Sequence, residues 1–144
     1  MYRLLVMLCV GLALASCGSS KPTSPQDPNA GMYGAWNGTL NVTWLDGART
    51  QDGISIALSR GAVAFYMSGA QYPATLSAIN DPGVGFTVNI FGYHSIFTGT
   101  RSGGTLQGYM SLPEVGANGS WATTRAPATA AYRGPGMADM LERR

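Results

Sequence analysis

Charged side chains are scarce in this sequence: Asp, Glu, Lys and Arg together make up 11% of its residues, and the formal net charge is +2. The basic residues of the central region, such as Arg49, Arg60 and Arg101, stand singly along the chain. A nucleic-acid surface needs clustered basic residues interleaved with aromatic ones. The composition therefore predicts no nucleic-acid partner.

Residues that bind metals are equally rare. His94 is the single histidine, and the two cysteines, Cys9 and Cys17, both lie near the N-terminus. This set cannot supply the three or four nitrogen and sulfur ligands that a zinc-type site needs. We therefore expect no metal ion.

Catalytic patterns are missing as well. Four acids of the central region lie in stretches with turn chemistry, where bonding to the local backbone accounts for them: Asp46, Asp52, Asp81 and Glu114. His94 and Ser95 are neighbours in a strand-like segment, so they are expected to point to opposite faces. No Gly-x-Ser-x-Gly motif is present. Without paired acids or a nucleophile and base, the sequence predicts that the protein is not an enzyme.

No segment with helical periodicity interrupts the central region; strict alternation of apolar and polar residues is found there instead. In "WNGTLNVTW" (36–44), Trp, Leu and Val alternate with Asn and Thr, which is typical of a strand with one buried face. The same alternation predicts seven further strands: 54–59, 63–67, 74–79, 84–90, 94–100, 105–111 and 119–125.

Turn residues such as Asp46-Gly47 and Asn118-Gly119 separate these segments, and Gly supplies the positive φ of tight hairpins. The pattern predicts an antiparallel meander. Unpaired edge strands promote aggregation, so closure of the last strand onto the first is favoured over an open sandwich. The predicted fold is all-β, an eight-stranded up-and-down barrel over residues 32–125.

The N-terminus carries a different signal. One Arg and then a run of about a dozen apolar residues, too short to span a bilayer of about 30 Å, are typical of a signal peptide over residues 1–16. Leu14-Ala15-Ser16-Cys17 resembles the lipobox of bacterial lipoproteins. The resemblance implies cleavage before Cys17 and covalent attachment of a diacylglycerol and an acyl lipid to it. An ordinary signal with a chance cysteine is the alternative.

Two or three acyl chains anchor a protein durably, so this resemblance implies a membrane partner and a location outside the cytoplasm, in the cell membrane or the outer membrane. Residues 17–31 contain three prolines and no large apolar side chain, which predicts a disordered tether. For residues 126–144, rich in Ala, Pro and Gly, disorder is predicted, with a partner-docking tail as the alternative.

A second resemblance concerns the predicted barrel. Gly34-Ala35-Trp36 matches the Gly-x-Trp of lipocalins, and Trp121 with Arg125 resembles their closing strand. The resemblance implies a structural latch in which Arg125 lies across Trp36. The lipocalin Thr-Asp-Tyr motif is missing between the sixth and seventh predicted strands, and the region is short for a lipocalin with a wide cup.

Strand alternation points many large apolar side chains inward, enough to fill an eight-stranded barrel or to leave a small apolar pocket. Residues Trp44, Leu58, Phe65 and Phe86 are the candidates for lining such a pocket. The longest predicted connection, Leu45–Gly53, lies where lipocalins carry a lid, and a solvated loop is its alternative interpretation.

Three functions follow from this pattern. In the first, which we favour, the anchored barrel binds or shields a small apolar ligand. In the second, the barrel is a solid scaffold that docks another envelope protein. An enzyme is the third, and it needs a polar cleft that the sequence does not indicate.

Overall fold

The structure is a computed structural model that describes residues 24–125 and Leu141. The predicted signal peptide, Cys17 with its lipid, and the predicted tail except Leu141 lie outside the described residues. Leu141 itself is buried among the core side chains. In the described part of the chain, no helix has the length and apolar character needed to cross a membrane.

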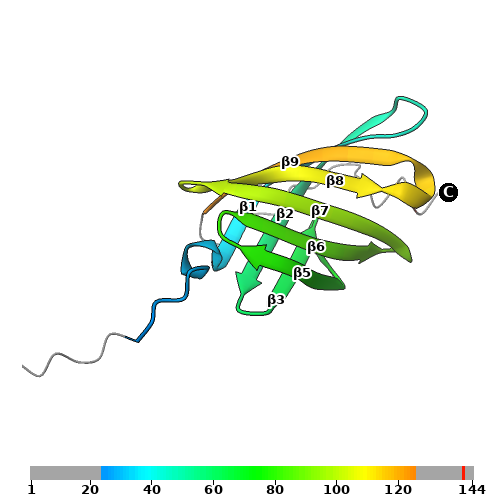
Figure 1. The fold of residues 1–144 in the computed structure, drawn as a ribbon. Helices are drawn as coiled ribbons and strands as arrows, with labels where there is room; N and C mark the ends of the chain where they lie inside the picture. The colour runs from blue at the N-terminus through cyan, green and yellow to red at the C-terminus, as the bar shows by residue number, and fades with distance from the viewer. Residues whose placement is uncertain (1–23, 126–140, 142–144) are drawn as a thin grey trace, which may run out of the picture.

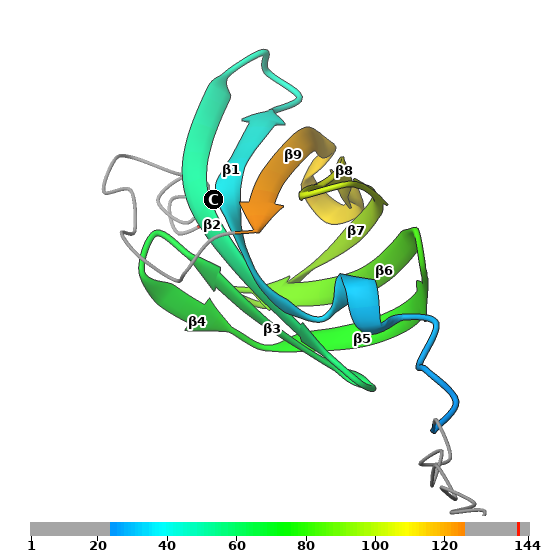
Figure 2. The same cartoon turned by 90° about the vertical axis from the view of Figure 1, so that its left-hand side faces the viewer.

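Antiparallel strands form one sheet, which curls into a nearly closed barrel (Figures 1 and 2). The described residues form nine strands: β1 (Gly34–Thr43), β2 (Arg49–Ser59), β3 (Ala62–Met67), β4 (Ala70–Tyr72), β5 (Ala74–Asn80), β6 (Gly83–Ile90), β7 (Tyr93–Ser102), β8 (Thr105–Leu112) and β9 (Ala117–Arg125). Two short 3₁₀ turns, η1 (Ala30–Met32) and η2 (Pro113–Val115), complete the fold. The predicted all-β barrel is confirmed.

The strand order is β4-β3-β2-β1-β9-β8-β7-β6-β5. The last strand therefore pairs with the first, as predicted, from Trp36 opposite Arg125 to Thr43 opposite Asn118. The two edges of the sheet are β4 and β5, which are consecutive in the chain and joined at Pro73. The break in the ladder thus lies at a bend in the chain, where β3 and β5 contact each other.

Two local predictions need correction. The structure has one more strand than predicted, because Ala70–Tyr72 pairs with β3 although it is too short to show alternation. The predicted connection Leu45–Gly53 is wrong, since β2 already begins at Arg49 and pairs with β1 there. The stretch 49–53 is polar and ends in Asp-Gly, so it imitates a loop in the sequence.

Asp52 illustrates this error. The sequence placed it in a turn, but it lies within β2, opposite Leu40, and is fully buried. The Ser68 hydroxyl donates a hydrogen bond of 3.0 Å to its Oδ1. A buried carboxyl group needs such partners, because transfer from water is costly.

The core follows the predicted alternation. In β1, Trp36, Leu40 and Val42 are buried, while Thr39 and Asn41 between them are exposed. The side chains that alternation predicts to point inward are all buried or, at Val63, half-buried and packed on the core. They are Leu40, Val42, Trp44, Ile54, Ile56, Leu58, Val63, Phe65, Met67, Phe86, Val88, Ile90, Leu106 and Met110. Sequence reasoning did not single out Met32, Phe97 and Leu112, which also belong to the core.

The last two residues of the predicted tether, Ala30 and Gly31, lie in η1. The tether was expected to extend through residue 31, but η1 covers one end of the barrel and buries Met32 (Figure 2). The side-chain oxygen of Asn29 accepts a 2.8 Å bond from the backbone N–H of Asp81. The composition of this segment could not predict its attachment to the barrel, because the attachment is made by backbone groups, small polar side chains and a single methionine.

We call this covered end, where Trp36 and Arg125 lie, the latch end of the barrel. The opposite end, where the chain leaves β1 through Trp44, is called the Trp44 end. The hairpins β2–β3, β5–β6 and β7–β8 turn at the latch end, whereas β6–β7 and η2 lie at the Trp44 end.

Candidate functional site

The four residues predicted to line an internal pocket all point inward. Trp44, Leu58, Phe65 and Phe86 are each exposed by no more than 3%. Phe65 and Phe86 lie 6.2 Å apart between ring centroids, and Phe97 packs against both, at 5.1 and 5.0 Å. Trp121 extends this cluster, with its ring 6.2 Å from Phe86 and 6.3 Å from Phe97. Packed aromatic rings thus occupy the middle of the barrel.

Few polar side chains share this interior. The Thr123 hydroxyl donates to the carbonyl oxygen of Leu106 at 2.8 Å. The Ser95 hydroxyl is buried, and no hydrogen-bond partner for it is found among the described residues. Its neighbour His94 is exposed on the outer face, so the two side chains lie on opposite sides of the sheet. They cannot work together as nucleophile and base.

His94 interacts instead with an acid at the Trp44 end. Its Nδ1 lies 3.4 Å from Oε1 of Glu114, and its backbone N–H donates to the same oxygen at 3.1 Å. These contacts, led by the backbone hydrogen bond, lower the pKa of Glu114. The pair fastens the start of β7 to η2 on the surface.

The two residues predicted to form a latch are in contact. Cζ of the Arg125 guanidinium lies 4.4 Å from the centroid of the Trp36 ring. The same guanidinium donates to the carbonyl oxygen of Tyr33 at 2.7 Å and to that of Gly31. The Trp36 indole N–H donates to the carbonyl oxygen of Met32 at 2.9 Å. Sequence reasoning named the pair, but not the three carbonyl groups of the approach segment that it binds.

Two acids, Asp81 and Asp27, make further contacts near the latch. Arg101 binds both carboxylate oxygens of Asp81, at 2.8 to 3.1 Å. Asp27 accepts a 2.8 Å bond from the Tyr33 hydroxyl and a 2.9 Å bond from the backbone N–H of Asn29. The Asn29 bond is the main cause of a lowered pKa at Asp27, and burial is the main cause of a raised pKa at Tyr33.

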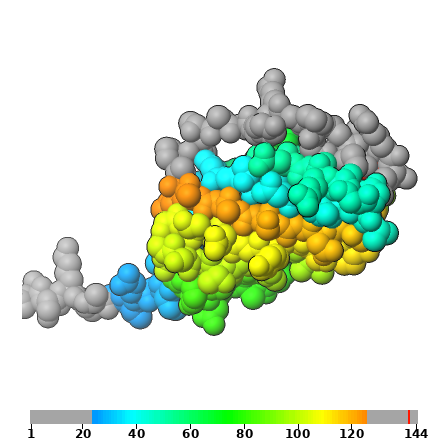
Figure 3. Space-filling model, turned by 90° about the horizontal axis from the view of Figure 1, so that it is seen from above, coloured from blue at the N-terminus to red at the C-terminus, as the bar shows by residue number. Residues whose placement is uncertain are grey.

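The outer face of the barrel carries two shallow depressions. The first, of about 530 Å³, lies over β7, β8, β9 and β1, whose outer surfaces are seen side by side in Figure 3. Its polar lining consists of Asn41, Thr98, Thr100, Gln107, Tyr109 and Ser120. The second, of about 680 Å³, extends the first toward β2 and shares Asn41, Tyr109 and Ser120 with it. We call the two together the outer groove.

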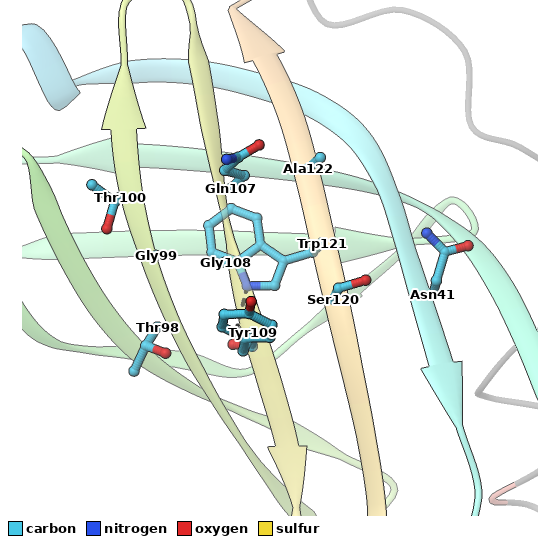
Figure 4. A pocket seen from close by; sticks show the side chains of 10 residues that line it. All are labelled: Asn41, Thr98, Gly99, Thr100, Gln107, Gly108, Tyr109, Ser120, Trp121 and Ala122. Carbon is cyan, nitrogen blue, oxygen red and sulfur yellow. Dashed lines mark hydrogen bonds between the residues drawn. The ribbon is translucent and has the colours of Figure 1, made fainter.

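Two glycines and an indole lie at the centre of the first depression (Figure 4). Gly99 and Gly108 are paired across β7 and β8, and Trp121 is paired with Gly108 across β8 and β9. A β-carbon at Gly99 would lie 2.5 Å from Cζ2 of Trp121, and one at Gly108 would lie 1.8 Å from the Thr98 carbonyl oxygen. The strands and the indole therefore pack closely only because both positions are glycine.

Side chains of Tyr109, Gln107 and Asn41 stand around this floor (Figure 4). The Tyr109 side chain is 74% exposed. Nε2 of Gln51 donates a 3.0 Å bond to Oδ1 of Asn41, which fixes the orientation of both amides. Arg49 is the charged residue in the lining of the second depression, and the lining of the first carries no charge.

Sequence reasoning missed the outer groove. It treated the Asn, Thr and Ser residues between the buried positions as ordinary surface. A usable signal was present, however, because Tyr109 is a large aromatic residue at an outward position among Thr, Gln and Ser. Strand pairing was needed to show that these positions on separate strands adjoin.

The part of the chain that the structure describes contains no group of three or more His, Cys, Asp or Glu side chains able to hold a metal ion. Comparison with protein-family models, with curated proteins and with solved structures gives no significant match to this chain. The site must therefore be interpreted from its own geometry.

Proposed function

We propose that this protein is a lipid-anchored lipoprotein of the bacterial envelope whose small β-barrel is a solid scaffold for recognition on its outer surface. The lipid on Cys17 holds the chain at the membrane, and residues 18 to 26 link the lipid to the domain. The outer faces of the barrel strands are then accessible to other molecules of the envelope.

One observation carries the choice of a scaffold over a carrier: the aromatic cluster in the barrel. Phe65, Phe86, Phe97 and Trp121 contact one another where a carried ligand would lie. Their close packing supports a filled core, since folded cores are packed as densely as organic crystals. The depressions on the outer face support recognition there.

An apolar ligand inside the barrel is the second candidate function, and the break in the ladder favours it. Edge strands β4 and β5 meet at the bend around Pro73 without a ladder between them. Movement of this seam would give a small apolar molecule access to the cluster around Phe65. Trp44, Leu58 and Phe86 are the other residues expected to contact it.

Native mass spectrometry separates these functions. The full-length chain is produced in a bacterial host and purified from membranes, beside a Cys17→Ser variant. We expect the wild-type protein in the membrane fraction, with a mass increased by covalent lipid, and the variant in the soluble fraction. Equal distribution of both proteins would contradict anchoring through Cys17.

The same spectra test the scaffold. A barrel that is solid carries no further mass beyond its covalent lipid. An additional mass of small-molecule size that is found in the wild-type protein and in the soluble variant, and that dissociates on unfolding, would show that the barrel is a ligand carrier. The proposal of a solid scaffold would then be wrong.

A further inference from the structure

We propose that the outer groove is a binding site for an uncharged glycan chain, with Tyr109 as its stacking platform. This inference rests on the proposed function, because it names what the outer face of the scaffold recognises. It is carried by the shape of the groove, by the chemistry of its lining and by the rigidity of the strands that form it.

The lining has the hydrogen-bonding groups that sugars need. Gln107, Asn41 and Gln51 carry amides, which both donate and accept, and Thr98, Thr100 and Ser120 carry hydroxyl groups. Pyranose hydroxyl groups also donate and accept, so they complement such a surface. The absence of charge from the first depression makes phosphate groups and metal ions poor occupants, because neither finds a counter-charge there.

Tyr109 provides the apolar element. Its ring is 74% exposed, in the middle of β8, and it belongs to the lining of both depressions. The face of an aromatic ring has negative electrostatic potential, which attracts the C–H groups on one face of a pyranose ring. A flat, exposed ring that shares its depressions with amide side chains therefore matches one sugar unit of a chain.

The groove is prepared for binding before a ligand arrives. All the lining side chains stand on strands, and sites built on strands are held more precisely than sites built on loops. The Gln51–Asn41 hydrogen bond holds two amides in place. In the first depression, the closely packed Gly99, Gly108 and Trp121 form a floor with little room to collapse into the core. Little conformational entropy is lost on binding such a surface.

The length of the groove indicates a chain rather than one sugar. The two depressions, of about 530 and 680 Å³, are joined at Asn41, Tyr109 and Ser120 and cross β7, β8, β9, β1 and β2. Sugars bearing acetamido groups and sugars bearing only hydroxyl groups share the chemistry argued here. Binding assays with one oligosaccharide of each kind distinguish these two classes of sugar.

Isothermal titration calorimetry with two tetrasaccharides tests the site: chitotetraose, built from N-acetylglucosamine, and cellotetraose, built from glucose. The full-length protein is used in a detergent that lacks a sugar head group. We expect the wild-type protein to bind at least one of them, and Tyr109→Ala to raise the Kd about tenfold. Gln107→Ala is expected to raise it about two- to tenfold, as loss of a hydrogen bond does.

Tyr66→Ala is the matched control. Tyr66 is also a tyrosine exposed on a strand, at 37%, but it belongs to neither depression. Its replacement should leave the Kd unchanged, and thermal unfolding of each variant checks that the barrel is intact. Failure of the wild-type protein to bind either sugar at about 10 mM would overturn the proposal. So would binding that Tyr109→Ala leaves unchanged or that Tyr66→Ala weakens equally.

The Cys17→Ser variant separates this proposal from the one on which it rests. It keeps the groove but lacks the proposed anchor. Sugar binding by a wild-type protein that is not membrane-bound would reject the anchor alone. Membrane attachment without sugar binding would reject the glycan site alone.

Discussion

At the latch end, the Met32 side chain and the Arg125 guanidinium close the barrel, whereas at the Trp44 end the Leu45 side chain lies open to solvent. Met32, the last residue of η1, is fully buried, and Arg125 binds two carbonyl groups of the approach segment. At the other end, Leu45 is 81% exposed and the Trp44 indole contacts the Thr50 hydroxyl at 3.3 Å. More contacts would therefore have to break to open the latch end than to open the Trp44 end.

This difference follows from where the described chain enters the barrel and where β9 leaves it. β1 begins and β9 ends at the latch end, so the approach segment and Arg125 are available to cover it. Among the described residues, the Trp44 end has the connection through Asp46-Gly47, the β6–β7 turn and η2. We therefore expect the latch end to contribute more to stability than the Trp44 end.

The largest expected effect comes from the side chain that η1 buries. Met32→Ala should lower the free energy of unfolding by about 2–5 kcal/mol, because the change leaves a cavity at the latch end. Leu45→Ala, at the Trp44 end, should change it by about 0.5 kcal/mol or less, since Leu45 already lies in solvent. Urea unfolding followed by tryptophan fluorescence measures both. Similar losses in the two variants would remove the distinction between the ends.

A smaller effect is expected at Arg125. Arg125→Ala removes the stacking on Trp36 and the bonds to Tyr33 and Gly31, so it should cost about 1–3 kcal/mol in the same assay. The free energy of unfolding of Arg125→Lys should lie between those of Arg125→Ala and the wild-type protein, because an ammonium group lacks the planar, forked donors of a guanidinium group. Arg49→Ala, on an exposed arginine near the Trp44 end, is the control and should lose about 0.5 kcal/mol or less. A free energy of unfolding of Arg125→Lys equal to that of the wild-type protein would show that positive charge alone accounts for the stabilisation by the latch.

Acidic pH should destabilise both ends of the barrel, and this effect should be smaller than those of the Met32 and Arg125 substitutions. The pKa of Asp27 is lowered from its ordinary value of 3.8, chiefly by the Asn29 backbone hydrogen bond, and that of Glu114 from 4.5, chiefly by the His94 backbone hydrogen bond. A carboxyl whose pKa is lower in the folded state stabilises the fold above its unfolded pKa. That contribution is lost as pH falls through the folded value.

Thermal unfolding from about pH 7 to about pH 2 follows this loss. Asp27→Asn should reduce the acid sensitivity that originates at the latch end, and Glu114→Gln the part from the Trp44 end. The double variant should have the flattest profile. A profile that Asp27→Asn leaves as steep as that of the wild-type protein would show that the Asp27 contacts do not stabilise the fold.

Alternation was sufficient to predict the barrel wall. A strand with one buried face repeats every two residues, so "WNGTLNVTW" specified both the strand and its inner side. Closure of β9 on β1 was also predictable, since it leaves fewer exposed edges. The first part of β2 was not predictable, because Arg49–Gly53 is polar and its pairing with β1 depends on a distant strand. Asp52 shows the same limit, since its partner Ser68 lies in the distant turn between β3 and β4.

The candidate site was less accessible from sequence. The aromatic residues predicted for a pocket do point inward, but only the structure shows that they pack on Phe97 and Trp121. The outer groove combines side chains from five strands, and no local pattern marks positions that become neighbours through pairing. Lipid attachment at Cys17 remains a prediction from the sequence alone.

The position of β1 between two partners has a mechanical consequence. β1 is paired along its length with β2 on one side and with β9 on the other. Ladder hydrogen bonds lie perpendicular to the strands, so a pull along β1 from its N-terminus loads them in shear, all at once, rather than one after another. If the chain is tethered through Cys17, drag on the domain is transmitted first to the hydrogen bond between Asn29 and Asp81, then to the contacts of Arg125 and then to both ladders. A tether placed there resists extraction better than one attached at the edge strands β4 or β5.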